Sequence, residues 1–258
     1  MKKCPATVLL VDGDILLYRF AFTNATKIDW GDDCVTTSSN LDKAIFDTDQ
    51  FILGLIEKTG TVKVIVCLTG SLNFRYEVLP SYKANRADKE KPELLDGIRD
   101  HLQEAYSTRL KEGLEADDVM GILSTRTPDK YIIASADKDM QTIPGWLFDW
   151  KDNTLRYVTE KEADYNFYTQ ILTGDTADGF KGCPGIGPKK AEKILDGCLE
   201  AWKPYVWERI VEAYEAKGLT EEDAIVQARV ARILRAEDYN FETKEVKLWT
   251  PPSYPSTE

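Results

Sequence analysis

Three short apolar runs along the chain predict buried β-strands. They cover residues 7–11 (TVLLV), 62–68 (VKVIVCL) and 131–135 (YIIAS). Runs that are apolar at nearly every position are typical of strands covered on both faces in a parallel sheet. Segments with helical periodicity, residues 41–58 and 117–124, lie between them. Strands that alternate with helices indicate an α/β fold with a doubly wound parallel sheet.

The pattern changes along the chain. Residues 146–150 and 155–158 have the alternation of a hairpin, which we place at the edge of the sheet. From about residue 160 onward helical patterns dominate, interrupted by the Gly- and Pro-rich stretch 174–188. We therefore expect an α/β domain over residues 1–160, followed by a helical region.

Carboxylates follow two of the predicted strands, at the places where open α/β sheets bind their ligands. Asp12 directly follows the first run, and Asp137 and Asp139 follow the third. In such sheets, ligands bind beyond the carboxyl ends of the strands. The alternate spacing of Asp137 and Asp139 would aim both side chains the same way if the chain stays extended, and two such carboxylates repel each other unless a cation lies between them.

Two further acidic groups lie at a predicted helix start and in a glycine-rich turn. Glu115, Asp117 and Asp118 open a predicted helix, whereas Asp175 and Asp178 lie in GDTADG. Each group alone has a structural explanation, because acids stabilise helix starts and aspartate is common at caps and turns. Their combination favours a metal centre, since hard oxygen ligands suit Mg²⁺ or Mn²⁺, and two such ions can clamp a phosphodiester.

Composition narrows the class of protein. The 258 residues include 33 Lys and Arg against 44 Asp and Glu, a net charge of −11, which by itself argues against a nucleic-acid partner. Without the acids named above, however, the remaining charges are nearly balanced. The five cysteines form no CxxC pair and His101 is the sole histidine, so we predict neither a disulfide framework nor a multi-histidine metal site. The first apolar run is too short for a membrane span or a secretory leader, so we expect a soluble intracellular protein.

A glycine-rich segment, residues 182–195 (GCPGIGPKKAEKIL), has the features of a phosphate-binding hairpin. Glycines let backbone amides approach a phosphate, and Pro188 suits the first turn of a helix whose N-terminus attracts an anion. The alternative is a tight interhelical turn with solvated lysines. The residues that we expect to contact DNA are Gly185, Gly187, Lys189, Lys190 and Lys193.

A second basic segment, residues 73–86 (NFRYEVLPSYKANR), interleaves cations with aromatic residues. Arg75, Lys83 and Arg86 can neutralise phosphates, and Tyr82 can offer a stacking face to a base. A charged loop over the sheet would have a similar composition, so this segment alone leaves both interpretations open.

Five motifs, VDGD, FRYEVLPSYKANR, EADD, SADKDM and GDTADGFKGCPGIGPKKA, occur in the order found in the 5′-nuclease superfamily. Over residues 7–195 the chain resembles flap endonucleases, the 5′-nuclease domain of bacterial DNA polymerase I and, above all, the small 5′→3′ exonucleases of bacteriophages. The resemblance implies a PIN-like catalytic domain over residues 1–160 with an arch over about 80–106. It also implies a helical DNA-binding region over residues 161–258, with a helix-hairpin-helix at 171–197.

The resemblance also implies roles for the acidic and basic residues. It identifies Asp12, Glu115 and Asp117 as ligands of a first metal ion, with Asp118 close by. It identifies Asp137, Asp139 and Asp178 as ligands of a second ion, with Asp175 nearby or in its outer shell. Lys83 and Arg86 would hold the scissile phosphate, Tyr82 would stack on the adjacent nucleotide, and Arg75 would contact a phosphate. A monovalent cation is implied at the hairpin.

The activity that the resemblance implies is divalent-metal-dependent cleavage of DNA at or near free 5′ ends. Duplex, flap and gapped DNA are the expected substrates, and a 5′-phosphate and a 3′-hydroxyl are the expected products, in replication, recombination or repair. We expect a monomer in the cytoplasm, the host's if the chain is phage-encoded. Removal of RNA from RNA–DNA hybrids and a non-catalytic DNA-binding module are the alternatives.

At one position the chain departs from the family pattern. Many relatives carry Asp-Gly after the strand that corresponds to residues 62–68, whereas this chain has Thr69 and Gly70. We expect the loss of one carboxylate to weaken the first metal site or to change its hydration.

Overall fold

The computed structural model describes residues 4–29, 35–86, 90–196 and 203–253. It divides into two compact units, each built from several stretches of the chain. Unit 1 comprises Met1–Leu72, Lys89–Lys138 and Gly145–Tyr157, and unit 2 comprises Asn73–Asp88, Asp139–Pro144 and Val158–Glu258. Among the described residues, no helix is both long enough and apolar enough to cross a membrane.

Unit 1 contains the predicted sheet. Its strands in the described part of the chain are β1 (Val8–Asp12), β4 (Lys63–Thr69), β5 (Thr108–Lys111), β6 (Tyr131–Ser135), β7 (Gly145–Asp149) and β8 (Thr154–Val158). They lie in the order β5-β4-β1-β6-β7-β8. The pairs β1–β4, β1–β6, β4–β5 and β6–β7 are all parallel. The prediction of a parallel α/β sheet, with residues 146–150 and 155–158 forming neighbouring strands at its edge, is confirmed.

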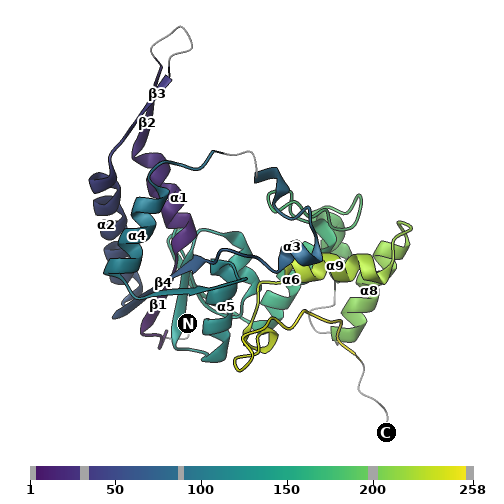
Figure 1. Ribbon diagram of the computed structural model, residues 1–258. Helices are drawn as coiled ribbons and strands as arrows, with labels where there is room; N and C mark the ends of the chain where they lie inside the picture. Colours follow the sequence, from purple (N-terminus) through teal and green to yellow (C-terminus); the bar gives the residue numbers. More distant parts are fainter. Residues whose placement is uncertain (1–3, 30–34, 87–89, 197–202, 254–258) are drawn as a thin grey trace. The chain divides into compact units, whose positions relative to one another are not determined.

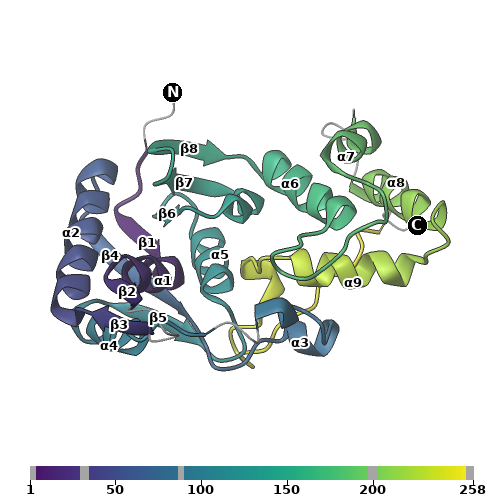
Figure 2. The same ribbon diagram turned by 90° about the horizontal axis from the view of Figure 1, so that it is seen from above.

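Helices cover both faces of this sheet, which explains why its central strands are apolar at nearly every position. The helices α1 (Gly13–Thr23), α2 (Leu41–Thr59) and α4 (Leu95–Ala105) lie on one side, and α5 (Ala116–Arg126) lies on the other (Figure 2). Leu9 and Val11 pack in the same core cluster as residues of the first three helices. Leu10, which points to the opposite face, is equally buried.

Two parts of unit 1 were not predicted from the apolar pattern. The edge strand β5 (TRLK) has no apolar run because its residues are only partly buried or exposed. The strands β2 (Ala25–Asp29) and β3 (Val35–Ser39) form an antiparallel hairpin between α1 and α2 (Figure 1). Their sequences, ATKID and VTTSS, are mostly polar, and the hairpin pairs only with itself in the described residues. A mostly polar sequence leaves little hydrophobic periodicity from which a strand can be predicted.

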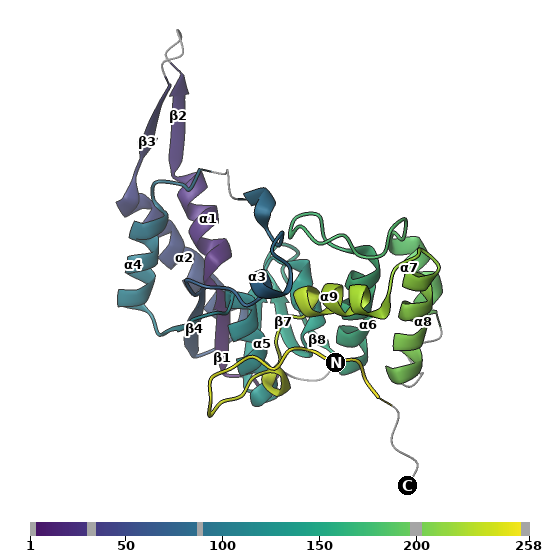
Figure 3. The ribbon, with the colours of Figure 1, turned by 45° about the vertical axis from the view of Figure 1, so that its right-hand side comes forward.

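Unit 2 is helical, as the second half of the sequence predicts. Its helices are α3 (Arg75–Val78), α6 (Glu160–Thr173), α7 (Pro188–Leu195), α8 (Lys203–Glu215) and α9 (Glu221–Ala231), with short 3₁₀ turns η1 (Ala84–Arg86), η2 (Lys138–Thr142) and η4 (Ala236–Asp238) near or within it. Helix α6 packs against α7 and α9, and α8 packs against α7 and α9 (Figure 3). Phe167, Ile171, Trp207 and Ile210 belong to their common core.

Candidate functional site

Asp12 occupies the junction between β1 and α1 in unit 1. It is the last residue of the strand and the N-cap of the helix, and its Oδ1 accepts the backbone N–H of Ile15 at 3.1 Å. Helix α1 can begin here because the next residue is glycine: a Cβ at Gly13 would lie 2.6 Å from the carbonyl oxygen of Cys67. The Asp-Gly-Asp sequence therefore presents two carboxylates, Asp12 and Asp14, at the carboxyl ends of β1 and β4.

A buried serine links Asp12 to a second predicted acid. The Ser135 hydroxyl donates to Asp12 Oδ2 at 2.7 Å and accepts the backbone N–H of Asp137 at 3.0 Å. Burial, together with the charges of Asp14 and Asp137, raises the pKa of Asp12 to about 7, and the Ser135 hydrogen bond opposes this shift. The charges of Asp14 and Asp137 therefore both act on Asp12.

Asp14 is a further carboxylate at this junction, and it was not among the predicted site residues although it stands in the VDGD motif. Its carboxylate accepts the backbone N–H of Thr69 at 3.3 Å and also the Thr69 hydroxyl. The Thr69 oxygen in turn accepts the backbone N–H of Ala116 at 3.0 Å. Burial raises the pKa of Asp14, the Thr69 hydrogen bonds oppose this, and the charge of Glu115 raises it further.

The acidic segment Glu115 to Asp118 begins α5, as predicted. Glu115 is the N-cap, and Asp118 closes a capping box by accepting the Glu115 backbone N–H at 3.1 Å. Asp118 is completely buried, and its carboxylate caps the start of the helix. Glu115 and Asp117 are half-buried.

The acids of unit 1 gather around the end of β4. Cys67 on β4 reports their proximity. Burial raises the pKa of its thiol, and the negative charges of Asp12, Asp14 and Asp117 contribute to the same shift. An all-oxygen donor set of this kind fits a hard divalent cation. In the part of the chain that the structure describes, no three His, Cys, Asp or Glu side chains are arranged to hold an ion by themselves. Mg²⁺ does not require such a cage, because it is usually held by one or two carboxylates together with water and substrate phosphates.

The chain does not stay extended between Asp137 and Asp139. The 3₁₀ turn η2 starts at Lys138, so the alternation of an extended chain does not apply to these two side chains. Asp139 belongs to unit 2. There the Gln170 amide on α6 donates to Asp139 Oδ1 at 2.5 Å.

A closed loop in unit 2 carries Asp175 and Asp178. Gly174 and Gly182 lie back to back at its ends, and Asp175 and Phe180 pair across it. Asp175 Oδ1 accepts the backbone N–H groups of Ala177 at 2.7 Å and Asp178 at 3.4 Å. Asp175 therefore shapes the turn that presents Asp178.

Asp178 holds the basic segment. Its backbone oxygen accepts the Lys83 N–H at 2.8 Å, and its Oδ2 lies 3.8 Å from Lys83 Nζ. Its Oδ1 pairs with Arg86 Nη2 at 2.6 Å, and its Oδ2 accepts the Tyr82 hydroxyl at 3.1 Å. Lys83 itself has a φ of 52°, the left-handed region that non-glycine residues rarely occupy. The predicted phosphate-holding residues Lys83 and Arg86 are thus brought together with the predicted metal ligand Asp178.

The glycine hairpin has the predicted backbone. Gly185 has a φ of 74°, Gly187 is the N-cap of α7, and Pro188 occupies the first turn. Lys189, Lys190 and Lys193 are exposed, and Lys190 Nζ also donates to the carbonyl oxygen of Gly185 at 2.8 Å.

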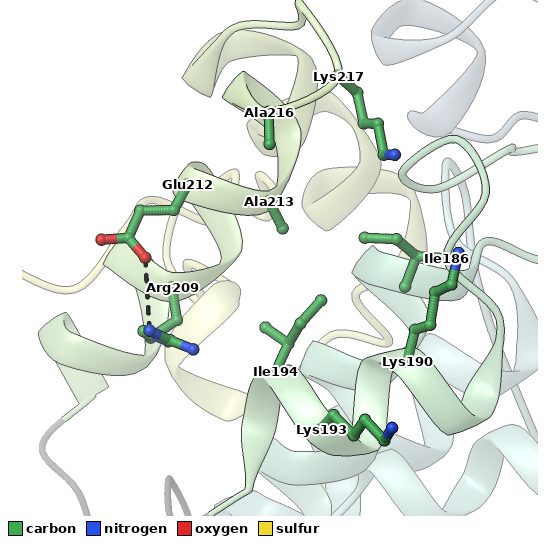
Figure 4. A pocket seen from close by; sticks show the side chains of 9 residues that line it. All are labelled: Ile186, Lys190, Lys193, Ile194, Arg209, Glu212, Ala213, Ala216 and Lys217. Atoms are coloured by element: carbon green, nitrogen blue, oxygen red, sulfur yellow. Dashed lines mark ion pairs between the residues drawn. The ribbon is translucent and has the colours of Figure 1, made fainter.

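Beside the hairpin, α7 and α8 enclose a pocket of about 410 Å³ (Figure 4). Ile186, Ile194 and Ala213 point into it, and cationic side chains surround it. Of these, Arg209 pairs with Glu212 at 3.6 Å, and the others are Lys190, Lys193 and Lys217. Arg209 of α8 and Lys217, just beyond its end, therefore add to the positive charge of the hairpin, which the sequence pattern had not indicated.

Comparison with known proteins decides the family. The model of the 5′–3′ exonuclease N-terminal, resolvase-like domain matches residues 7–175. The chain belongs to the 5′–3′ exonuclease family. It is 30% identical to the exonuclease of Escherichia phage T7 over 95% of this chain and 93% of that protein. It is 32% identical to the flap endonuclease Xni of Vibrio campbellii over 69% of this chain and 75% of that protein.

A solved structure has the same fold. The bacteriophage T5 D15 flap endonuclease, crystallised as a pseudo-enzyme-product complex with DNA and metal ions, matches 88% of this chain and 89% of its own chain. The TM-score is 0.64 and the sequence identity is 18%. The predicted α/β fold of the 5′-nuclease superfamily is therefore confirmed.

Two predicted DNA contacts of this 5′–3′ exonuclease need correction. Arg75 is 2% exposed, and its guanidinium donates to the carbonyl oxygens of Val230 at 2.9 Å and Arg232 at 2.7 Å. It anchors the basic segment to the end of α9 and presents no surface to a phosphate. Tyr82 is also 2% exposed, so its ring is unavailable for stacking on a nucleotide. The exposed aromatic residue in this segment is Tyr76, whose side chain is 50% exposed.

Proposed function

We propose that the chain hydrolyses DNA phosphodiester bonds at or near free 5′ ends, as an exonuclease and flap endonuclease that depends on a divalent cation. The observation that carries this proposal is the buried Asp12 at the end of β1, which Ser135 links to Asp137 and whose carboxylate experiences the negative charge of Asp14. Carboxylates that repel one another in a desolvated site are stabilised when a cation binds between them. The named relatives support the activity, and the T5 complex with DNA and metal ions supports both the cation and the substrate.

The proposed ligands are those of the two metal ions that the family resemblance implies. In unit 1 they are Asp12, Glu115, Asp117 and Asp137, and Asp118 caps the helix that carries Glu115. In unit 2 they are Asp139 and Asp178, and Asp175 shapes the turn that presents Asp178. Mg²⁺ or Mn²⁺, as two ions, is the cofactor that this donor set favours. When bound, these cations stabilise the negative charge that develops on the phosphoryl group and the leaving oxygen.

The basic segment would hold the scissile phosphate. Asp178 orients Lys83 and Arg86 through contacts to both side chains and to the Lys83 backbone. A positively charged side chain that is already fixed in position needs no reorganisation when negative charge develops on the phosphate during the reaction. Preorganised groups lower a reaction barrier in this way. Lys83 and Arg86 therefore bind and orient the phosphate, and Lys83 stabilises its charge in the transition state.

Replacing Lys83 by alanine tests the proposed function. We expect the single-turnover cleavage rate of a 5′-labelled DNA flap in Mg²⁺ to fall by roughly 10²- to 10³-fold, which is typical for removal of one charge-stabilising donor. Alanine has the same steric restriction at positive φ as lysine, so this change introduces no new backbone strain. Lys58→Ala, at an exposed position on α2, is the matched control. Cleavage by Lys83→Ala at the control rate would contradict the assignment.

The same assay separates the proposed function from its alternatives. Substrates with a DNA or an RNA 5′ strand, each as blunt, recessed, gapped and flapped duplexes, are compared at equal concentration. We expect cleavage of the DNA strands at their 5′ ends. Selective loss of the RNA strand would instead identify an RNA–DNA hybrid nuclease. Binding of DNA with no cleavage in Mg²⁺ or Mn²⁺ would identify a non-catalytic module.

The hairpin lysines are expected to bind the duplex backbone. Lys189 is exposed in the first turn of α7, where the helix N-terminus also attracts phosphate, and Lys193 is exposed in the last turn. Replacing each by glutamine should weaken duplex binding irrespective of sequence. It should also reduce the slope of log affinity against log salt by about 0.9 for each phosphate that the variant no longer neutralises. Fluorescence anisotropy across a salt series measures this, with Lys58→Gln on α2 as the control. An unchanged slope would exclude these lysines from the DNA-binding surface.

A further inference from the structure

Thr69 and Asp14 form a hydroxyl–carboxylate pair that mirrors the pair of Ser135 and Asp12. Ser135 is the last residue of β6, and its hydroxyl joins Asp12 to the backbone of Asp137. Thr69 is the last residue of β4, and its hydroxyl joins Asp14 to the backbone of Ala116. Each hydroxyl therefore fixes one carboxylate at the start of α1. Ser135 connects it to the segment that carries Asp137, and Thr69 connects it to the acidic segment that begins α5.

Asp14 has contacts that a simple helix-start acid does not need. It lies at the second position of α1, where even a solvent-exposed acid interacts favourably with the helix dipole. Asp42 occupies the same position in α2 and is exposed, as that role requires. Asp14, in contrast, is half-buried and accepts two hydrogen bonds from the end of a different strand. The dipole alone does not account for this desolvation.

The charges around Asp14 connect it to both groups of proposed ligands in unit 1. Its charge acts on Asp12, and the charge of Glu115 acts on it. Arg99 of α4 supports the arrangement, because its guanidinium donates to the Thr69 carbonyl oxygen at 2.7 Å and its positive charge acts on Asp14. Asp14 is thus an acid between the Asp12 and Glu115 positions, held in place by Thr69.

We propose that Asp14 is a further carboxylate of the metal centre in unit 1, and that Thr69 is its positioning residue. The inference rests on the proposed function. It also gives the Thr69 position a physical role: where the sequence suggests a lost carboxylate, the structure has a hydroxyl that holds a carboxylate supplied by α1. Asp14 adds negative charge toward the cation, and Thr69 keeps the Asp14 oxygens from turning into solvent.

Measurement of Mn²⁺ binding tests this proposal. The full chain is titrated with Mn²⁺ in the absence of DNA, and binding is monitored by calorimetry or by the electron paramagnetic resonance signal of free Mn²⁺. We expect Asp14→Asn to weaken Mn²⁺ binding by about 10- to 100-fold, whereas Asp42→Asn retains the wild-type affinity. Thr69→Val, which removes the hydroxyl and keeps the shape, should weaken binding by about tenfold, in the range typical for partners that orient metal ligands. Thr69→Ser should restore most of the affinity because it keeps the hydroxyl.

The outcomes separate this inference from the proposed function. Wild-type affinity in Asp14→Asn together with lost affinity in Asp12→Asn would overturn the role of Asp14 and leave the metal-dependent nuclease intact. Absence of Mn²⁺ binding by the wild-type chain would overturn both. Thermal melting of the metal-free variants checks folding, and Asp14→Asn is expected to melt no lower than the wild type because it removes a desolvated charge. If Thr69→Ser binds as weakly as Thr69→Val, Thr69 does not position Asp14.

Discussion

Asp12→Asn is expected to lower the rate of DNA cleavage by about 10³-fold or more while leaving the metal-free protein at least as stable as the wild type. The loss of activity follows because a proposed ligand becomes neutral, and metal-based stabilisation of the transition state contributes several kcal/mol. Single-turnover cleavage of a 5′-labelled flap in Mg²⁺ measures the rate. Asp42→Asn, at an exposed position, is the control.

The gain in stability has an electrostatic cause. Asparagine keeps the N-cap oxygen for Ile15 and a hydrogen-bonding partner for Ser135, so the local structure is retained. It removes a carboxyl whose pKa is raised from 3.8 to about 7 in the folded protein. Such a shift corresponds to an upper bound of about 4 kcal/mol against folding at alkaline pH.

The sign of the pH dependence follows from the same shift. Between pH 4 and pH 7 the folded wild type retains a proton on Asp12 that the unfolded chain releases. Folding stability of the metal-free wild type should therefore decrease as pH rises through this interval, and Asp12→Asn should show a smaller decrease. Chemical denaturation in EDTA at pH 5 and pH 8 measures both slopes. Equal slopes, or wild-type cleavage by the variant, would contradict the role assigned to Asp12.

Gly182→Ala is expected to reduce the stability of unit 2 by about 3 kcal/mol or more and to abolish cleavage with it. Gly182 has a φ of 63°, and a Cβ there would lie 2.2 Å from the backbone nitrogen of Gly174 and 2.8 Å from the carbonyl oxygen of Leu172. Both neighbours are backbone atoms, which cannot move aside as the end of a side chain can. The loop that presents Asp175 and Asp178 would have to open.

A second glycine provides the matched control. Gly185 has a similar φ of 74°, but a Cβ there would meet nothing within 4 Å. Gly185→Ala should therefore cost only the left-handed backbone term of about 1 to 2 kcal/mol. Thermal unfolding should show a decrease of about 6 to 12 °C for Gly182→Ala and a smaller one for Gly185→Ala. Similar melting curves for the two variants would show that the close approach of Gly174 and Gly182 does not limit stability.

The local parts of the site were predictable from the sequence because they depend on neighbouring residues. The apolar run of residues 7–11 ends at Asp12, and the structure places the end of β1 there. Pro188 after Gly187 predicted the start of a helix, and α7 begins at that residue. Asp118 was expected at a helix start, and it completes a capping box with Glu115. Each of these predictions used only the spacing of residues within one or two turns.

The errors have a common physical origin. Asp137 and Asp139 would point the same way only in an extended chain, but a 3₁₀ turn follows Asp137. Tyr82 was expected to be exposed because of its basic neighbours, yet it belongs to the core of unit 2. The strand β5 carries too few apolar residues to be distinguished from a loop. In each case the deciding factor was an environment that the local pattern does not contain.

By itself, the sequence determined which acids end the central strands, where the glycine hairpin lies and to which superfamily the order of motifs points. Only the tertiary structure decided what Thr69, Arg75 and Tyr82 do. Their partners Asp14, Val230 and Asp178 lie 55, 155 and 96 positions away along the chain. A side chain's burial and hydrogen bonds are set by residues that folding brings beside it, and periodicity within one segment carries no information about them.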